Sequence, residues 1–234
     1  MIFDNNGIQI CMDKAVAIDM FDPSGIPHTK WLSATRWEIE SDPDGVCDGV
    51  IAKLGWPIFV KPANAGSSVG ITKAHDRDEL KAAIRLALAN DRKVVFEAFV
   101  DGHEVECAVI GSDPAVSTRP GEILAGAEFY TYDDKYKNGV SQTVIPAHLS
   151  EEKLDEVRAE ARKAYLALGC SGLSRCDFFV ERNTGRVLCN ELNTLPGFTS
   201  ISMYPKLMEH EGYSYPALVD KLLTLAVHRR KGAY

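Results

Sequence analysis

The sequence has no long apolar run, no leader-like opening and no CxxC pair of cysteines. None of the apolar runs in its 234 residues approaches the ~20 residues that cross a bilayer. The chain opens on MIFDNNGIQI, which lacks the basic stretch and apolar core of a secretory signal. We therefore expect a cytoplasmic protein with no membrane as partner.

Positive charge is also scarce. Lysine and arginine number 26 against 33 aspartates and glutamates, so the formal net charge is −7. A chain of this sign offers no broad basic surface, and we expect no nucleic-acid partner. An acidic ligand such as a nucleotide would need local cations or a metal ion. With 45% hydrophobic and 25% charged residues, the chain can form one large domain or two small ones.

The six cysteines lack the spacing of a zinc site or a disulfide framework. Without a leader they are expected to be free thiols in a reducing compartment. Cys176 directly precedes Asp177, so a catalytic thiol is one interpretation. A small buried apolar side chain is the other, and the pattern favours it.

Helices and strands alternate in clusters along the chain. Apolar spacing and capping residues predict helices at 13–21, 76–90, 151–168 and 216–227. Apolar runs predict strands at 56–62, 94–100 and 104–111, followed by a hairpin within 175–192. The helix at 151–168 should bury Leu154, Val157, Ala161, Ala164, Tyr165 and Leu168. The order favours an α+β fold of two lobes, with the boundary near residue 105.

The hairpin places polar residues opposite one another. If it turns on 183–185 (NTG), with glycine in the left-handed position, Asp177 lies opposite Glu191 and Arg175 opposite Asn193. The two-residue period of a strand puts these four side chains on one face. The other face should carry Cys176, Phe178, Val180, Leu188 and Leu192.

Facing carboxylates are the reason to expect a metal ion here. Two carboxylates directly opposite lie ~5 Å apart and repel unless a cation bridges them. Oxygen-only ligands, here Asp177 and Glu191 with the amide of Asn193, select a hard ion such as Mg²⁺. The alternative is a solvated face with an ordinary contact between Arg175 and Asp177.

A second segment could bind phosphate. KPANAGSSVG (61–70) follows a strand directly, and Gly66 and Gly70 let the backbone approach a ligand closely. The hydroxyls of Ser67 and Ser68 add donors, and Lys61 adds a charge. The segment is not a Walker loop, because the Gly-Lys-Ser/Thr ending is missing. By itself it is equally compatible with a surface turn.

Taken together, these segments resemble the ATP-grasp superfamily, and more closely the D-alanine–D-alanine ligases. The resemblance extends from about residue 11 to residue 228, in the order of the family's motifs. The matching motifs are CMDK (11–14), VKPANAGSSVG (60–70), EAFVDGHE (97–104), FYTYDDKY (129–136), GLSRCDFF (172–179) and NELNTLPGFTSISMYP (190–205).

The resemblance implies an ATP site between two lobes. The residues that it implies for ATP are Lys14, Lys61, Ser68, Glu97, Ala98, Phe99, Val100, Glu104, Phe129 and Lys135. Among them the lysines would contact phosphates, 97–100 would hold adenine, and Glu104 would accept the ribose hydroxyls. Asp177, Glu191 and Asn193 would bind two Mg²⁺ ions, for which Mn²⁺ can substitute.

The resemblance also implies the reaction. ATP would convert D-alanine to an acyl phosphate, which the amine of a second D-alanine attacks, giving a peptidoglycan precursor. Arg175 and the backbone N–H of Gly197 would stabilise the oxyanion. Residues 129–146 would close over the site, since water would destroy the acyl phosphate. Ser67 and Tyr136 would act on the first substrate.

Ser202 and Met203 would line the pocket for the second amino acid. The closing loop FYTYDDKY resembles the form in dipeptide ligases, which favours D-alanine over D-lactate. The apolar Met203 suits a methyl side chain better than a hydroxymethyl one. Apolar pockets discriminate weakly, so D-serine stays open as a second substrate.

The chain departs from the family's pattern at its start. The family carries a further domain ahead of CMDK, where this chain has only residues 1–13, interpreted as a linker before lobes 14–104 and 105–234. That domain holds part of the first substrate's pocket. One hypothesis is a ligase completed by a homodimer or a separate chain. The other is a nucleotide-binding fragment that holds Mg-ATP without making dipeptide.

Overall fold

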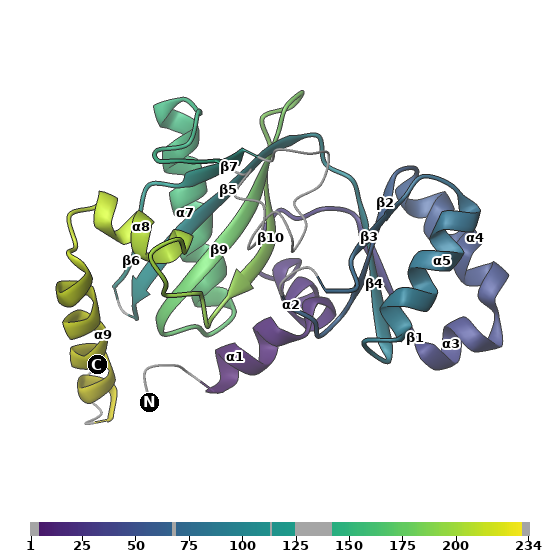
Figure 1. The fold of residues 1–234 in the computed structure, drawn as a ribbon, viewed down its shortest axis with the longest axis horizontal. Coiled ribbons are helices and arrows are strands. Elements are labelled where there is room, and N and C mark those ends of the chain that lie inside the picture. Colours follow the sequence, from purple (N-terminus) through teal and green to yellow (C-terminus); the bar gives the residue numbers. More distant parts are fainter. Residues whose placement is uncertain (1–4, 67–68, 113, 125–141, 231–234) are drawn as a thin grey trace.

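The computed structural model describes residues 5–66, 69–112, 114–124 and 142–230. Two antiparallel sheets lie side by side, with helix α2 (Lys14–Phe21) between them (Figure 1). This arrangement confirms the predicted α+β class. In the described part of the chain, no helix combines the length and apolar character needed to cross a membrane.

The first sheet has the strand order β1-β4-β2-β3. Its strands are β1 (Trp31–Thr35), β2 (Ile58–Pro62), β3 (Thr72–Ala74) and β4 (Lys93–Ala98). The helices that cover one of its faces are α3 (Arg36–Ser41), α4 (Pro43–Leu54) and α5 (Arg77–Leu88). Ile58, Val60 and Phe96 are fully buried against these helices. Because side chains alternate along a strand, Lys61 and Glu97 point to the opposite face.

The second sheet has the order β10-β9-β5-β7-β8, with β6 paired to β5. Its strands are β5 (Gly102–Gly111), β6 (Ala115–Ser117), β7 (Gly121–Leu124), β8 (Gln142–Val144), β9 (Gly172–Glu181) and β10 (Val187–Asn193). The other helices of the described residues are α1 (Asn5–Met12), α2 (Lys14–Phe21), α7 (Glu151–Ala167), α8 (Met203–His210) and α9 (Tyr215–Arg230).

The two faces of the second sheet carry different cores. Val105, Cys107 and Val109 of β5 pack with α2 and α7. Ala108 and Ile110, which alternate with them, pack with α8 and α9. Glu104 and Glu106 share the face of Ala108 but lie nearer the start of the strand. That face therefore changes along β5 from acidic to apolar.

The predicted helices form where their capping residues and periodicity indicate. The side chain of Asp13 caps α2 by accepting the N–H groups of Ala15 and Val16, and Asp76 caps α5 in the same way. The predicted apolar stripe of α7 is buried as expected: Leu154, Val157, Ala161, Ala164, Tyr165 and Leu168.

The hairpin has the predicted site register but not the predicted turn. Near the turn Val187 lies opposite Val180, so the expected three-residue turn at 183–185 is wrong. A register shift between Cys189 and Glu191 then inserts one extra residue in β10. Beyond this bulge Glu191 lies opposite Asp177, as predicted.

The prediction for Leu188, which lies before the bulge, is also wrong. Val187 and Cys189, on either side of it, pack in the core with Cys176 and Phe178. Leu188 alternates with them and therefore points to the other face of β10, where it lies opposite Phe179. Leu192 packs in the core as predicted, because it follows the bulge.

We propose a lobe boundary between β4 and β5, close to the residue 105 expected from the sequence. Helix α2, which the sequence grouped with the first lobe, packs in a core that contains residues of both sheets and of α7. Its Ala15, Ile18 and Phe21 are buried in the core that α7 shares. We propose that the first lobe runs from β1 to β4 and that α1 and α2 belong with the second.

Candidate functional site

Three carboxylates form a row across the second sheet. Glu106 of β5 lies directly opposite Asp177 of β9, and Asp177 lies opposite Glu191 of β10. Glu106 and Asp177 are 5% and 4% exposed, and the side chain of Glu191 is 32% exposed. In the neighbouring row Arg175 lies opposite Asn193. The sheet thus gathers the predicted metal ligands at one place.

Arg175 is the cation nearest to two of these carboxylates. Its Nε lies 2.7 Å from Asp177 Oδ1 and its Nη2 lies 2.6 Å from Asp177 Oδ2. The same Nε lies 3.0 Å from Glu106 Oε2. Burial alone would lower the pKa of Arg175, but the attraction of Asp177 and Glu106 outweighs it and raises that pKa further. The guanidinium therefore stays charged.

Lys14 neutralises the third carboxylate. Its Nζ lies 2.8 Å from Glu191 Oε2 and donates to the carbonyl of Ala65 at 3.3 Å. Its backbone N–H donates to the carbonyl of Ala63 at 3.0 Å. The start of α2 therefore joins segment 61–66 to the carboxylate row.

The pair shifts the pKa values of both partners. The charge of Lys14 holds the pKa of Glu191 well below its usual range, although burial acts the other way. Burial by itself lowers the pKa of Lys14, but Glu191 outweighs it and the net shift is upward. Both groups are charged at neutral pH.

Lys61 pairs with Glu97 on the adjoining face of the first sheet. Lys61 Nζ lies 2.5 Å from Glu97 Oε2, and the two residues are 8% and 4% exposed. The charge of Lys61 also helps to lower the pKa of Glu191, and Glu97 helps to raise that of Lys14. The two lobes therefore contribute charges to one cluster.

The charge balance of this cluster fits a divalent cation. It holds the carboxylates of Glu97, Glu106, Asp177 and Glu191, whereas its cations are Lys14, Lys61 and Arg175. One negative charge is left over, and all the anionic donors are oxygens, which suits Mg²⁺. Among the described residues no three His, Cys, Asp or Glu side chains converge as a preformed metal centre. A cation would therefore share carboxylate oxygens with Arg175 and Lys14.

Asn193 is oriented by the loop that follows it. Its Oδ1 accepts the N–H of Leu195 at 3.1 Å, and its backbone carbonyl accepts the hydroxyl of Ser174. An amide oxygen has two lone pairs, so Oδ1 can accept one bond and still bind a metal ion.

The predicted adenine segment, residues 97–100, joins the two sheets. The N–H of Ala98 donates to the carbonyl of Lys30 at 2.9 Å, and that of Phe99 to the carbonyl of Pro57 at 3.2 Å. The Phe99 ring is 40% exposed and lies 4.3 Å from Lys73 Nζ.

Two other predicted nucleotide residues flank this segment. Val100 is half-buried beside Phe99, and Glu104 is half-buried on the face that carries Glu106. The segment and Glu104 are thus continuous with the acidic end of β5.

The loop after β10 is closely packed around Gly197. A Cβ atom at Gly197 would lie 2.6 Å from Ser202 Oγ, so a larger residue would displace this hydroxyl. Ser202 Oγ accepts the N–H of Thr199 at 3.1 Å and lies 2.9 Å from Thr199 Oγ1. Met203 is 7% exposed and packs in the core of α8 with Tyr204.

Five predicted site residues lie outside the described residues: Ser67, Ser68, Phe129, Lys135 and Tyr136. Most of the predicted closing loop, 129–146, lies there too.

One residue of the site, Glu106, was absent from the sequence prediction. Its spacing from Glu104 on a predicted strand would have placed both on one face. What the sequence did not reveal is that β5 pairs with β9.

Cys176 is a core residue, as the favoured interpretation predicted. It is fully buried, and burial raises the pKa of its thiol well above the ordinary value. A buried neutral thiol does not act as a nucleophile.

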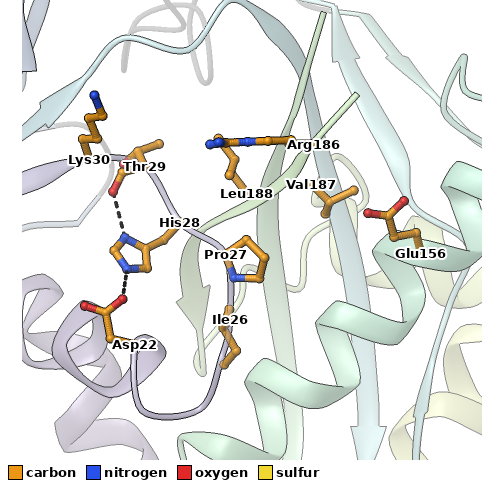
Figure 2. Close-up of a pocket in the computed structure, with 10 residues that line it drawn as sticks. All are labelled: Asp22, Ile26, Pro27, His28, Thr29, Lys30, Glu156, Arg186, Val187 and Leu188. Carbon is orange, nitrogen blue, oxygen red and sulfur yellow. Dashed lines mark hydrogen bonds and ion pairs between the residues drawn. The ribbon is translucent and has the colours of Figure 1, made fainter. Parts of the chain in front are cut away.

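A separate hollow of about 500 Å³ lies beside the start of β10 (Figure 2). His28 stands between Asp22 and the carbonyl of Thr29, with Arg186 and Glu156 across the hollow. None of the predicted site residues is among the ten that line it.

The comparisons with known proteins agree on one family. The family model described as the C-terminus of D-ala D-ala ligase matches residues 20–224. The D-alanine–D-alanine ligase of Acetivibrio thermocellus is 54% identical over 218 residues, which are 93% of this chain and 58% of that relative. The D-alanine–D-alanine ligase of Halothermothrix orenii is 46% identical over 94% of this chain and 64% of its own length.

Two solved structures have the same fold. The VanG D-Ala:D-Ser ligase from Enterococcus faecalis superimposes with a TM-score of 0.86 at 38% identity, over 96% of this chain and 64% of that one. The D-alanine–D-alanine ligase from Coxiella burnetii gives a TM-score of 0.84 at 32% identity, over 97% and 60%.

The fold is that of the ATP-grasp class. Within that class, the chain belongs to the D-alanine–D-alanine ligase family. It spans 58% and 64% of the length of the two curated relatives named above.

Proposed function

We propose that this chain carries the nucleotide site and the catalytic residues of an ATP-dependent D-alanine–D-alanine ligase. The observation that carries the proposal is the row of Glu106, Asp177 and Glu191, with Lys14 and Arg175 beside it. Such a row combines oxygen ligands for a metal with cations for phosphate. The relatives at up to 54% identity support the same activity.

ATP and Mg²⁺ are the proposed cofactors. When bound, they supply the phosphoryl group that activates a carboxylate and the positive charge that offsets it. Asp177, Glu191 and Asn193 would hold the metal, and Lys14 and Lys61 would neutralise phosphate oxygens. Glu97 to Val100 and Glu104 would hold the nucleoside, with Ser68, Phe129 and Lys135 completing that site.

In this proposal, the amino-acid half of the reaction depends on donors near the start of β9 and in the loop after β10. We propose that Arg175 and the N–H of Gly197 stabilise the oxyanion formed when an amine attacks the activated carboxylate. Removing one such donor costs about 3 kcal/mol, or roughly 10²-fold in rate. Ser67 and Tyr136 would orient the first substrate, and Ser202 and Met203 would contact the second.

A D-alanine–D-serine ligase is the second candidate. The observation in its favour is the likeness to the VanG D-Ala:D-Ser ligase, at a TM-score of 0.86 and 38% identity. The apolar Met203 favours a methyl side chain, although such contacts discriminate by only ~1–3 kcal/mol. Either reaction would take place in the cytoplasm, where D-alanine would be the common substrate.

The test is to identify the product by mass spectrometry. The chain is incubated with Mg-ATP and equal amounts of D-alanine and D-serine. Formation of D-alanyl-D-alanine supports the first proposal, and a dominant D-alanyl-D-serine product supports the second. If neither dipeptide forms although the chain binds Mg-ATP, the 234 residues act as a nucleotide-binding fragment.

A further inference from the structure

We propose that Glu106 is a positioning residue, which holds Arg175 and thereby leaves Asp177 able to bind a divalent cation. This inference rests on the proposed function, since it concerns the same nucleotide and metal site. It adds Glu106 of β5 to a metal site whose ligands the sequence prediction placed on the hairpin alone.

The geometry places one guanidinium between two carboxylates. Arg175 Nε lies 2.7 Å from Asp177 Oδ1 and 3.0 Å from Glu106 Oε2. Glu106 lies directly opposite Asp177 in the pairing of β5 with β9. Their side chains are 7% and 6% exposed, and that of Arg175 is 16% exposed, so water screens these charges weakly.

The charges explain why this arrangement matters for a cation. Arg175 donates hydrogen bonds to both oxygens of Asp177, and Glu106 Oε2 forms an ion pair with the same Nε. The charge of Glu106 therefore offsets part of the guanidinium charge, and Asp177 keeps part of its negative charge uncompensated. Without the charge of Glu106, Arg175 would compensate Asp177 alone and compete with any metal ion for its oxygens. Removing one negative charge would also remove the excess of anions over cations in the cluster. Both effects weaken the binding of a divalent cation.

A purely structural role for Glu106 makes a different prediction. In that case it only stabilises the sheet, as a buried partner of Arg175, and its loss lowers stability without changing the metal dependence. The chain offers a matched control in Glu122 of β7, which is 4% exposed. Glu122 bonds to His103 at 2.6 Å and to the N–H of His148 at 2.9 Å. It lies opposite Val105, so it points to the other face of the sheet.

The experiment measures how the affinity for ATP depends on free Mg²⁺. ATP is titrated into the 234-residue chain by calorimetry at a series of Mg²⁺ concentrations, and the half-maximal Mg²⁺ concentration is recorded. The variants are Glu106→Gln, Glu106→Asp and the control Glu122→Gln. We expect Glu106→Gln to raise the half-maximal concentration about tenfold. Glu106→Asp, which keeps the charge, should remain close to the wild type, as should Glu122→Gln.

The outcomes separate this inference from the proposed function. A half-maximal concentration in Glu106→Gln equal to that of the wild type overturns the inference, as does an equal rise in Glu122→Gln. If Glu106→Gln does not fold, the test rests on Glu106→Asp, which keeps the charge. A large rise in its half-maximal Mg²⁺ concentration contradicts the inference. If the wild type binds no ATP at any Mg²⁺ concentration, the proposed nucleotide site itself is wrong.

Discussion

At the scale of single residues, Lys61, which forms a buried pair with Glu97, has a structural role and a proposed role toward phosphate that can be separated. Each partner cancels a charge that burial would otherwise make very costly, so the pair belongs to the folded state of the chain without any ligand. The same lysine is the proposed phosphate contact. Its structural role requires Glu97, whereas its proposed role toward phosphate requires only its own charge.

The first prediction follows from this difference. Lys61→Met leaves Glu97 buried without its cation, and we expect the free energy of unfolding in urea to fall by about 3–5 kcal/mol. Lys61→Met combined with Glu97→Gln should recover most of that loss. Affinity for Mg-ATP should nevertheless be weaker in the double variant than in Glu97→Gln alone. Equal affinities would contradict a phosphate contact by Lys61.

The second prediction concerns pH and Glu191. Its pKa in the folded chain is held well below the ordinary value of 4.5, chiefly by Lys14. A depressed pKa means that the ionised form stabilises the fold above about pH 4.5, and that this stabilisation is lost as the pH falls below it. The difference in unfolding free energy between wild type and Glu191→Gln should therefore shrink between pH 6 and pH 3 in urea denaturation. A constant difference over that range would refute the ion pair.

At the scale of elements, the hairpin shows how a strand pairing can be predicted correctly from an incorrect turn. The prediction assumed a symmetric three-residue turn, whereas the structure pairs Val180 with Val187 and corrects the register with a bulge after Cys189. The turn shifts the strand pairing by one residue relative to the prediction, and the bulge shifts it back. The predicted pairing of Asp177 with Glu191 is therefore correct, whereas that of Leu188, which precedes the bulge, is wrong. Two carboxylates on one hairpin face can be recognised from the sequence even when the turn is assigned wrongly, whereas the sequence gives little indication of a bulge.

Helices were predictable because their signals are local. Asp13 and Asp76 cap α2 and α5, and the apolar period of α7 spans the whole helix. Thr35 and Glu38 form a capping box at α3, a signal present in the sequence that the prediction did not use. Glu106 was missed for another reason, since its role depends on the pairing of β5 with β9, and no local pattern encodes such pairing.

The third prediction tests the loop after β10. Gly197→Ala places a methyl group against Ser202 Oγ and should break the bonds of that hydroxyl to Thr199. We expect a loss of about 1 kcal/mol in the free energy of unfolding. Ser202→Ala should remove most of this effect, so the double variant should be less destabilised than the sum of the single ones. Additive losses would mean that Gly197 and Ser202 do not interact.

At the scale of the whole molecule, the two lobes meet at one charged cluster. Lys61 and Glu97 come from the first sheet, whereas Arg175, Asp177 and Glu191 come from the second. Helix α2 packs in the second core, yet its first residue, Lys14, bonds to the backbone of segment 61–66. The sequence predicted both lobes, whereas the assignment of α2 to the second is our proposal from its packing.

The fourth prediction concerns the thiols of the folded chain. Cys11 is half-buried, and the other five cysteines are buried. Burial raises the pKa of Cys107, Cys176 and Cys189, which slows their reaction with thiol reagents. We expect a disulfide reagent to label Cys11 rapidly in the native chain and all six cysteines in urea. Rapid native labelling of Cys176, found by peptide mapping, would contradict the packing of the second core.

The measurement that tests the central claim most directly is phosphate release from Mg-ATP by the 234-residue chain, with and without D-alanine. Glu191→Gln serves as the site variant, and Glu152→Gln, an exposed residue of α7, is the matched control. The account predicts release that requires D-alanine, falls at least about 10²-fold in Glu191→Gln and persists in Glu152→Gln. Equal release in Glu191→Gln and the wild type would contradict the proposal that the carboxylate row is the site of the reaction.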